Sequence, residues 1–110
     1  MLDRLTKETF LPHVGEVFEI YYAPTAFVSA VLLEVTGIGR PRGAPPRFGE
    51  APRPTERPEG FFIVLRGDAE PPLRQGMYRL VHPVMGELAA VFLTVTGADE
   101  RSRYYEALFN

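Results

Sequence analysis

Two histidines and their neighbouring carboxylates are the residues of this chain whose types suit metal or acid–base chemistry. His13 stands three residues before Glu16, and His82 stands five residues before Glu87. If the fold brings them together, two imidazoles and two carboxylates suit a divalent metal ion or a small polar ligand. Neither spacing is that of a helical H-E-x-x-H motif, so the pairs must converge through folding. The alternative for His82, which precedes Pro83, is that it ends a strand and hydrogen-bonds the backbone of the following turn.

Material for nucleophilic catalysis is sparse. The chain has no cysteine, which excludes disulfides, thiolate metal sites and a cysteine nucleophile. Ser29 falls in the middle of a predicted strand, where we expect a small packing residue, and Ser102 falls in a polar turn; neither lies in a G-x-S-x-G motif. Glu16, Glu34 and Glu87 lie on or beside predicted strands, so a glycosidase-type carboxylate pair stays open. With 14 acidic residues in a small domain, however, such pairs also arise by chance.

The strongest break in composition falls at residues 40–58. This segment holds six of the eleven prolines and five arginines against two glutamates. Its net charge is therefore +3, which leaves −5 for the rest of a chain whose formal charge is −2. Proline fixes its own φ and lacks the N–H that helices and central strands need. We therefore expect an extended surface loop within a single domain that spans residues 1–110.

This loop and two tyrosine pairs form the predicted interaction surface. The first interpretation of the loop is a solvated, functionally silent insertion. The second is docking on a protein partner, which arginines next to prolines and a phenylalanine suit. The acidic balance of the remaining chain disfavours nucleic acid. Each tyrosine pair places one ring on either face of a strand, which leaves one ring of each pair for an interface. The candidate residues are Arg40, Arg42, Arg47, Phe48, Arg53, Arg57, Tyr22 and Tyr104.

The pattern along the chain predicts a small all-β domain. Residues 5–10 suit one helical turn with Thr6 as N-cap. Short runs of β-branched and aromatic residues between glycine and proline turns indicate about six mainly antiparallel strands, in a small barrel or a two-sheet sandwich. The second of these runs is apolar on both sides near its centre, so we expect it to be buried on both faces. The predicted strands cover residues 16–22, 27–36, 60–67, 77–82, 87–96 and 103–109.

Several separated motifs resemble a bacterial family of small proteins that is classified only as a domain of unknown function. The motifs are L-T-x-E-x-F-x-P-H-x-G-E-x-F from Leu5, F-x-V-L-R-G from Phe62, Q-G-x-Y-x-L-x-H-P-x-x-G from Gln75, F-L-x-V-x-G from Phe92 and Y-E-A-x-F-N from Tyr105. The resemblance implies an all-β fold and a gene setting similar to that of phage-tail-collar-like proteins. It implies no catalytic residues. The glycines of these motifs, Gly15, Gly67, Gly76 and Gly86, are expected in turns.

These observations favour a non-enzymatic structural or interaction protein, an accessory or subunit of a bacterial tail-like or filamentous assembly. We expect a protein partner or a homo-oligomer, docked through exposed strand edges of an open barrel, and no cofactor, metal or membrane. The alternative is a small-ligand or metal-binding barrel, possibly enzymatic, that uses His13, His82 and nearby carboxylates. The amino terminus lacks the apolar core of a signal peptide, so we expect a cytoplasmic protein.

Overall fold

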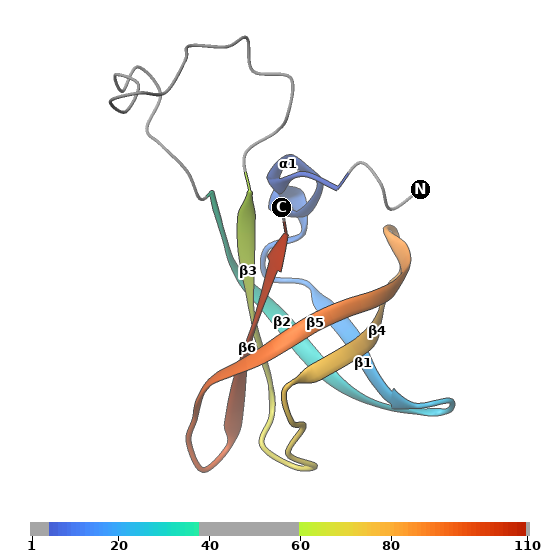
Figure 1. Ribbon diagram of the computed structural model, residues 1–110, viewed down its shortest axis with the longest axis vertical. Coiled ribbons are helices and arrows are strands. Elements are labelled where there is room, and N and C mark those ends of the chain that lie inside the picture. Colours follow the sequence, from blue (N-terminus) through green and yellow to red (C-terminus); the bar gives the residue numbers. More distant parts are fainter. Residues whose placement is uncertain (1–4, 38–59, 110) are drawn as a thin grey trace, which may run out of the picture.

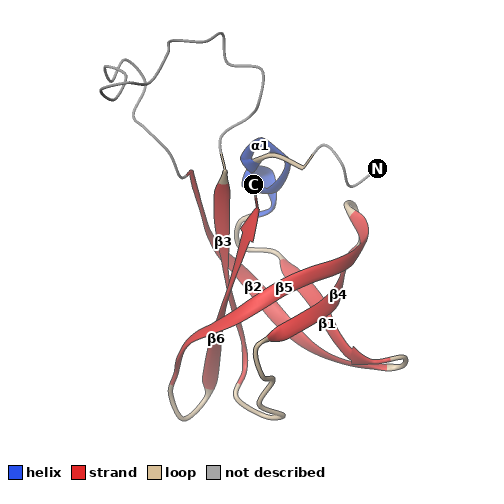
Figure 2. Cartoon of the chain, in the orientation of Figure 1, coloured by secondary structure: helices blue, strands red, loops and turns tan. Residues whose placement is uncertain are grey.

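Six antiparallel strands close into one barrel in a computed structural model that describes residues 5–37 and 60–109. The strand order around the barrel is β1-β2-β3-β6-β5-β4, and β4 pairs back onto β1 (Figure 1). A short helix and one 3-10 turn precede the strands (Figure 2). The elements are α1 (Lys7–Phe10), η2 (Leu11–His13), β1 (Val17–Ala23), β2 (Ala26–Gly37), β3 (Phe61–Asp68), β4 (Gly76–His82), β5 (Gly86–Ala98) and β6 (Ser102–Phe109).

The all-β prediction is confirmed, and the architecture is the barrel rather than the sandwich. Each predicted strand is present, with bounds that differ by at most two residues at either end. The expected open barrel with free strand edges is wrong. Each of the six described strands pairs with a neighbour on both sides, so none of them is an edge strand along its whole length.

Alternation of side chains along the strands builds a single interior. In β3, Phe61, Ile63 and Leu65 are buried and the residues between them are more exposed. The expectation that β2 is buried on both faces is wrong, as is the packing role of Ser29, because the outer face of a closed barrel has no second sheet against it. The buried hydrophobic residues are Phe10, Phe18, Ile20, Val28, Ala30, Leu32, Phe61, Ile63, Leu65, Leu73, Leu80, Leu88, Val91, Leu93, Tyr105 and Ala107.

The N-terminal helical turn caps one end of this interior. Thr6 is the N-cap, as predicted, and its backbone N–H donates to Thr9 Oγ1 over 3.1 Å. The turn directs Phe10 inward, where its fully buried ring lies 5.7 Å from the ring of Phe61 and 5.4 Å from that of Phe109. In Figure 1, α1 accordingly lies beside the carboxyl end of β6. Within residues 5–37 and 60–109, no helix is long and apolar enough to cross a membrane.

Of the four motif glycines, Gly15 lies in a turn and Gly86 begins β5 directly after the turn from β4. Gly15 and Gly86 have φ of 91° and 80°, which a residue with a side chain rarely adopts. The turn prediction is wrong for Gly67, which lies inside β3, and for Gly76, which begins β4. A Cβ at Gly67 would lie 3.4 Å from the ring of Tyr105, so glycine here leaves room for that ring.

We expect Phe10→Ala to destabilise the barrel by about 3–5 kcal/mol, because it leaves a cavity where a buried aromatic side chain closes the core. Urea unfolding followed by circular dichroism measures this difference. The matched control is Leu11→Ala, since Leu11 is adjacent and 46% exposed. Equal losses in the two variants would show that the helical turn does not seal the core through Phe10.

Candidate functional site

Three of the four residues of the predicted histidine–carboxylate cluster meet at one end of the pairing between β1 and β4. His13 ends η2, Glu16 precedes β1 and His82 ends β4. Glu87 does not join them. Its carboxylate lies 3.5 Å from the guanidinium of Arg79, its neighbour on the outer surface.

One carboxylate oxygen connects the two imidazoles. Glu16 Oε1 lies 2.8 Å from His13 Nδ1 and 2.7 Å from His82 Nε2. The two ring centroids are 4.5 Å apart, with an angle of 61° between the ring planes. The convergence on which the metal or ligand hypothesis depends is therefore present, although the residues lie up to 69 positions apart in the sequence.

Local backbone geometry presents Glu16 to both histidines. The positive φ of Gly15 turns the chain back so that the Glu16 N–H donates to the His13 carbonyl over 3.0 Å. The Gly15 N–H donates to the carbonyl of Leu32 over 2.7 Å, and the Leu32 N–H donates to the Glu16 carbonyl over 3.0 Å. The backbone that carries the carboxylate is thus attached to β2 on one side and to η2 on the other.

The position of the proton on His82 follows from its hydrogen bonds. His82 Nδ1 lies 3.0 Å from the backbone nitrogen of Val84 and 3.1 Å from that of Met85. Both backbone groups are donors, so Nδ1 must accept and carries no proton. The proton of the neutral ring is therefore on Nε2, where it is donated to Glu16 Oε1. The prediction that His82 hydrogen-bonds the turn after its strand is confirmed.

The charge of Glu16 determines the role of His13. Hydrogen bonds from His13 and then from His82 hold the pKa of the Glu16 carboxyl below its usual value of 4.5, although desolvation opposes them. An ionised carboxylate only accepts, so His13 Nδ1 carries a proton and donates it. In a neutral His13 ring, Nε2 then keeps a free lone pair. Among the described residues no side chain is hydrogen-bonded to this atom.

The cluster has the ligand types of a metal site, but the positions of its protons disfavour a bound metal ion. One ligand atom from each of the three residues lies within 4.8 Å of the others. A metal ion on His82 Nε2 would need the proton of that ring to move to Nδ1. Nδ1–H would then face the N–H groups of Val84 and Met85 at hydrogen-bond distance, donor against donor. The geometry therefore favours a cluster in which hydrogen bonds join Glu16 to both histidines, and His13 Nε2 is the imidazole nitrogen to which no described side chain is hydrogen-bonded.

The predicted interaction residues do not form one surface. Arg40, Arg42, Arg47, Phe48, Arg53 and Arg57 lie outside the described residues. Tyr22 is 45% exposed near the end of β1, and Tyr104 is half-buried on β6. Strands β1 and β6 stand three places apart in the six-strand circuit, so these two tyrosines lie on opposite walls of the barrel.

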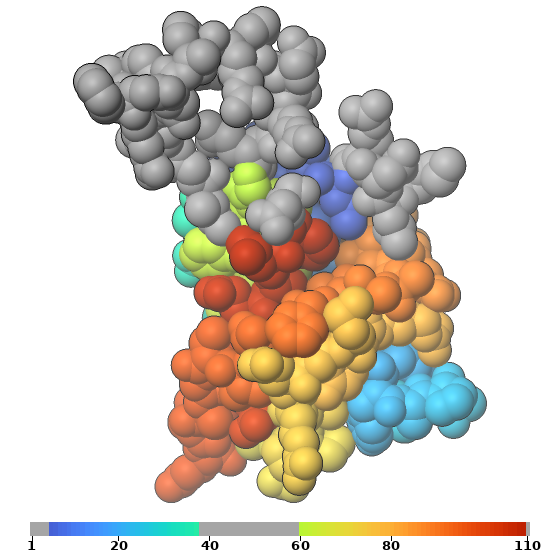
Figure 3. Space-filling model, in the orientation of Figure 1, coloured from blue at the N-terminus to red at the C-terminus, as the bar shows by residue number. Residues whose placement is uncertain are grey.

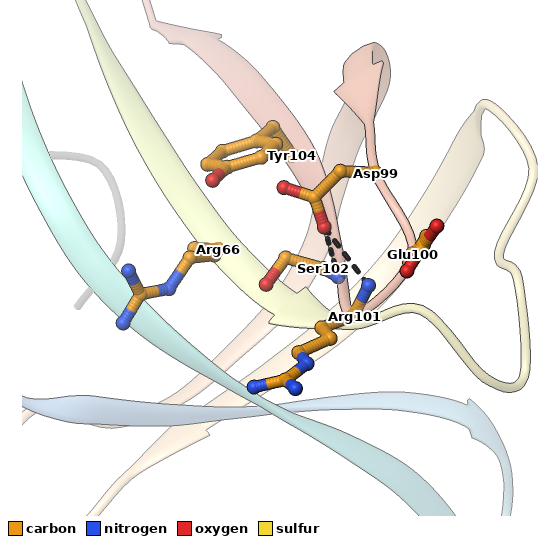
Figure 4. A pocket seen from close by; sticks show the side chains of 6 residues that line it. All are labelled: Arg66, Asp99, Glu100, Arg101, Ser102 and Tyr104. Carbon is orange, nitrogen blue, oxygen red and sulfur yellow. Dashed lines mark hydrogen bonds between the residues drawn. The ribbon is translucent and has the colours of Figure 1, made fainter.

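Tyr104 lines an open depression of about 570 Å³ beside the β5–β6 turn. Figure 4 shows its polar lining, which includes two arginines, Arg66 and Arg101. The carboxylate of Asp99 accepts the backbone N–H groups of Arg101 and Ser102 over 2.9 and 2.8 Å, and these bonds lower its pKa. Asp99 therefore stabilises the turn, and with Glu100 it offsets the positive charge that an anion site would need.

A row of apolar side chains, three of them exposed and Phe62 half-buried, crosses the outer face of four adjacent strands. Met77 on β4 pairs with Phe92 on β5, and Leu108 on β6 pairs with Phe62 on β3. The β5–β6 ladder begins at Leu93 and Ala107, so Phe92 and Leu108 are the next residues just past its end on these two strands. The exposed fractions are 61% for Met77, 46% for Phe92 and 56% for Leu108. We call Met77, Phe92, Leu108 and Phe62 the apolar row.

The apolar row lies on the wall of the barrel that β5 crosses in Figure 1. Figure 3 shows this side, where β6, β5 and β4 appear in red, orange and yellow. The four side chains come from separate motifs, and nothing in the linear sequence sets them apart from core aromatics. Only strand register, which aligns Phe92 with both Met77 and Leu108, brings them together. The unusual signal is local: Phe92 and Leu108 are apolar at positions where alternation with buried Leu93 and Ala107 calls for polar residues.

The comparisons with known proteins give a family. A family model described as a domain of unknown function, DUF6916, matches residues 5–109, so the chain belongs to this family. The predicted membership in an uncharacterised family is confirmed at this level. Neither the curated proteins nor the solved structures yielded a match.

We expect Glu16→Gln to lower stability near neutral pH and to have less effect in acid. The folded pKa of Glu16 is depressed, so its contribution is present above the unfolded value of about 4.5 and is lost as pH falls through the folded pKa. Urea midpoints of both proteins across this range measure the difference. Glu100→Gln, an exposed control in the β5–β6 turn, should show no such dependence. A constant gap between wild type and Glu16→Gln would contradict this role of the ionised carboxylate.

We expect equimolar zinc to leave the thermal midpoint unchanged, because His82 Nε2 keeps its proton. Long-range proton–nitrogen NMR spectra of the imidazoles should show Nε2 protonated and Nδ1 unprotonated in His82, with or without zinc. The opposite tautomer, or a zinc-dependent rise in the midpoint that His13→Asn abolishes, would instead support a metal site.

Proposed function

We propose that this protein is a non-enzymatic interaction protein that docks through the apolar row on its outer wall. The observation that carries the proposal is the continuity of this row across β4, β5, β6 and β3. Apolar side chains on neighbouring strands have Cβ atoms about 5 Å apart, so four of them form one strip. Contiguous exposed apolar surface on a small protein is typical of a protein-binding site.

Closure of the barrel supports the same proposal. With every described strand paired on both sides, we expect association to use side chains on the outer face rather than backbone edges. The residues on that face are also those of an interface core, since phenylalanine and methionine are enriched in such cores. We extend the proposal to the setting implied by the sequence resemblance, which is an accessory or subunit of a bacterial tail-like or filamentous assembly.

A second candidate function is small-ligand binding at His13. The observation that favours it is the carboxylate–imidazole pair, in which Glu16 orients His13 and leaves Nε2 as an acceptor. Such a pair suits a ligand that donates a hydrogen bond or a proton. An enzymatic version would need a reacting group beside Nε2, and in the described part of the chain no hydroxyl is hydrogen-bonded to either imidazole.

We expect Phe92→Ser and Leu108→Ser each to weaken self-association or partner binding roughly tenfold, since truncating a central interface side chain costs about 1–2 kcal/mol. Light scattering over a concentration series, with circular dichroism to verify the fold, measures the effect. Val84→Ser is the matched control, because Val84 is 77% exposed and lies outside the apolar row. Unchanged association in both row variants would refute the proposal.

A further inference from the structure

Two carboxylates lie beside the apolar row, at a level two residues further along β3 and β6; one is on β6 and the other on the adjacent strand β2. Glu34 on β2 pairs with Val64 on β3, and Val64 pairs with Glu106 on β6. Val64 and Glu106 are on the outer face, because their strand neighbours Ile63, Leu65, Tyr105 and Ala107 are buried. Glu34 is exposed and pairs with Val64, so it lies on the same face. The two glutamates are therefore about 10 Å apart, with Val64 between them.

Neither glutamate is neutralised within the described part of the chain. Glu34 Oε2 accepts the hydroxyl of Thr36 over 2.7 Å, a neutral donor, and no described lysine or arginine lies within ion-pair distance of either carboxylate. The wall thus presents an apolar strip edged by two negative charges. A binding partner that matches this wall in polarity and charge is an extended chain that carries apolar groups and arginines at short intervals.

Residues 40–58 of this same sequence have that composition. Five arginines alternate with six prolines around Phe48, and the segment carries +3 against −5 for the rest of the chain. Proline-rich chains favour an extended conformation and lose little entropy on docking against apolar and aromatic surfaces. Arginine binds carboxylates with two parallel hydrogen bonds, which lysine cannot do, and eleven of the twelve basic residues are arginine.

We infer that the apolar row together with Glu34 and Glu106 binds the segment 40–58 of a second copy of this chain. Each copy carries one wall and one segment, so the contact is head-to-tail. Head-to-tail contacts that do not close into a ring continue into a filament. The inference rests on the proposed function and adds to it the identity of the partner.

A pair of complementary full-length variants tests the inference. One variant, Glu34→Arg with Glu106→Arg, retains the segment but loses the charge of the wall. The other replaces the five arginines of residues 40–58 by glutamate and retains the wall. We expect each alone to associate at least tenfold more weakly than wild type in sedimentation velocity. The two mixed should form a dimer, because the intact wall of the second variant can bind the intact segment of the first, whereas either mixed with wild type should end its chains and shorten them.

The matched control is Glu70→Arg with Glu100→Arg, which makes the same charge change at exposed turn positions away from the wall. It should associate as wild type does. A second measurement does not depend on variant folding: a labelled peptide of residues 40–58 should bind wild type in fluorescence anisotropy, more weakly as salt increases. A peptide with arginines replaced by glutamate should bind at least tenfold more weakly.

Three outcomes would overturn the inference. They are wild-type protein that is monomeric at all concentrations, association that survives both charge variants, and failure of the wild-type chain to bind the peptide. If Phe92→Ser and Leu108→Ser abolish association while both charge variants retain it, the apolar row docks another partner. The proposed function then stands and only this inference fails.

Discussion

Closure of the barrel between β1 and β4 is the constraint on which the rest of the structure depends. This ladder has only three residue pairs, whereas β3 and β6 share eight. It cannot continue past His82, because the next residue, Pro83, has no N–H to donate. Side chains extend the contact instead: the ring of Phe18 lies 4.6 Å from that of His82, and Glu16 accepts the His82 Nε2–H. The histidine–carboxylate cluster is thus the continuation of the weakest ladder.

The same closure decides which part of the molecule can bind a partner. A sandwich of these strands would have free edges, and edge pairing would compete with any side-chain interface. In the barrel, the inner residues Leu93 and Ala107 fill the core, so their neighbours Phe92 and Leu108 must face outward. Their apolar character is then unexplained by folding. A small barrel gains nothing in stability from leaving such side chains in water, which makes binding the simplest reason for them.

Much of the fold could be predicted from the sequence, because it depends on local signals. Glycine and proline turns bound the strands, and the hydrogen bonds from His82 to its own turn need only residues 82–85. The candidate site was harder to predict from the sequence, since it depends on the register between strands. Glu16 rather than Glu87 joins the histidines because Glu87 precedes the buried Leu88 on β5 and therefore faces outward, where it lies 3.5 Å from Arg79. Likewise, the apolar row exists only once β5 is aligned with both β4 and β6.

The histidine–carboxylate cluster and the apolar row lie at opposite ends of β4. His82 ends this strand and Met77 stands near its start, five residues away, which is about 16 Å along an extended chain. Sites separated by more than about 10 Å without shared partners act nearly independently. Proton uptake at Glu16 therefore acts on barrel closure without altering the apolar row. Stability and the proposed association are thus expected to vary separately, because the first depends on the β1–β4 ladder and the second would depend on the wall from β4 to β3.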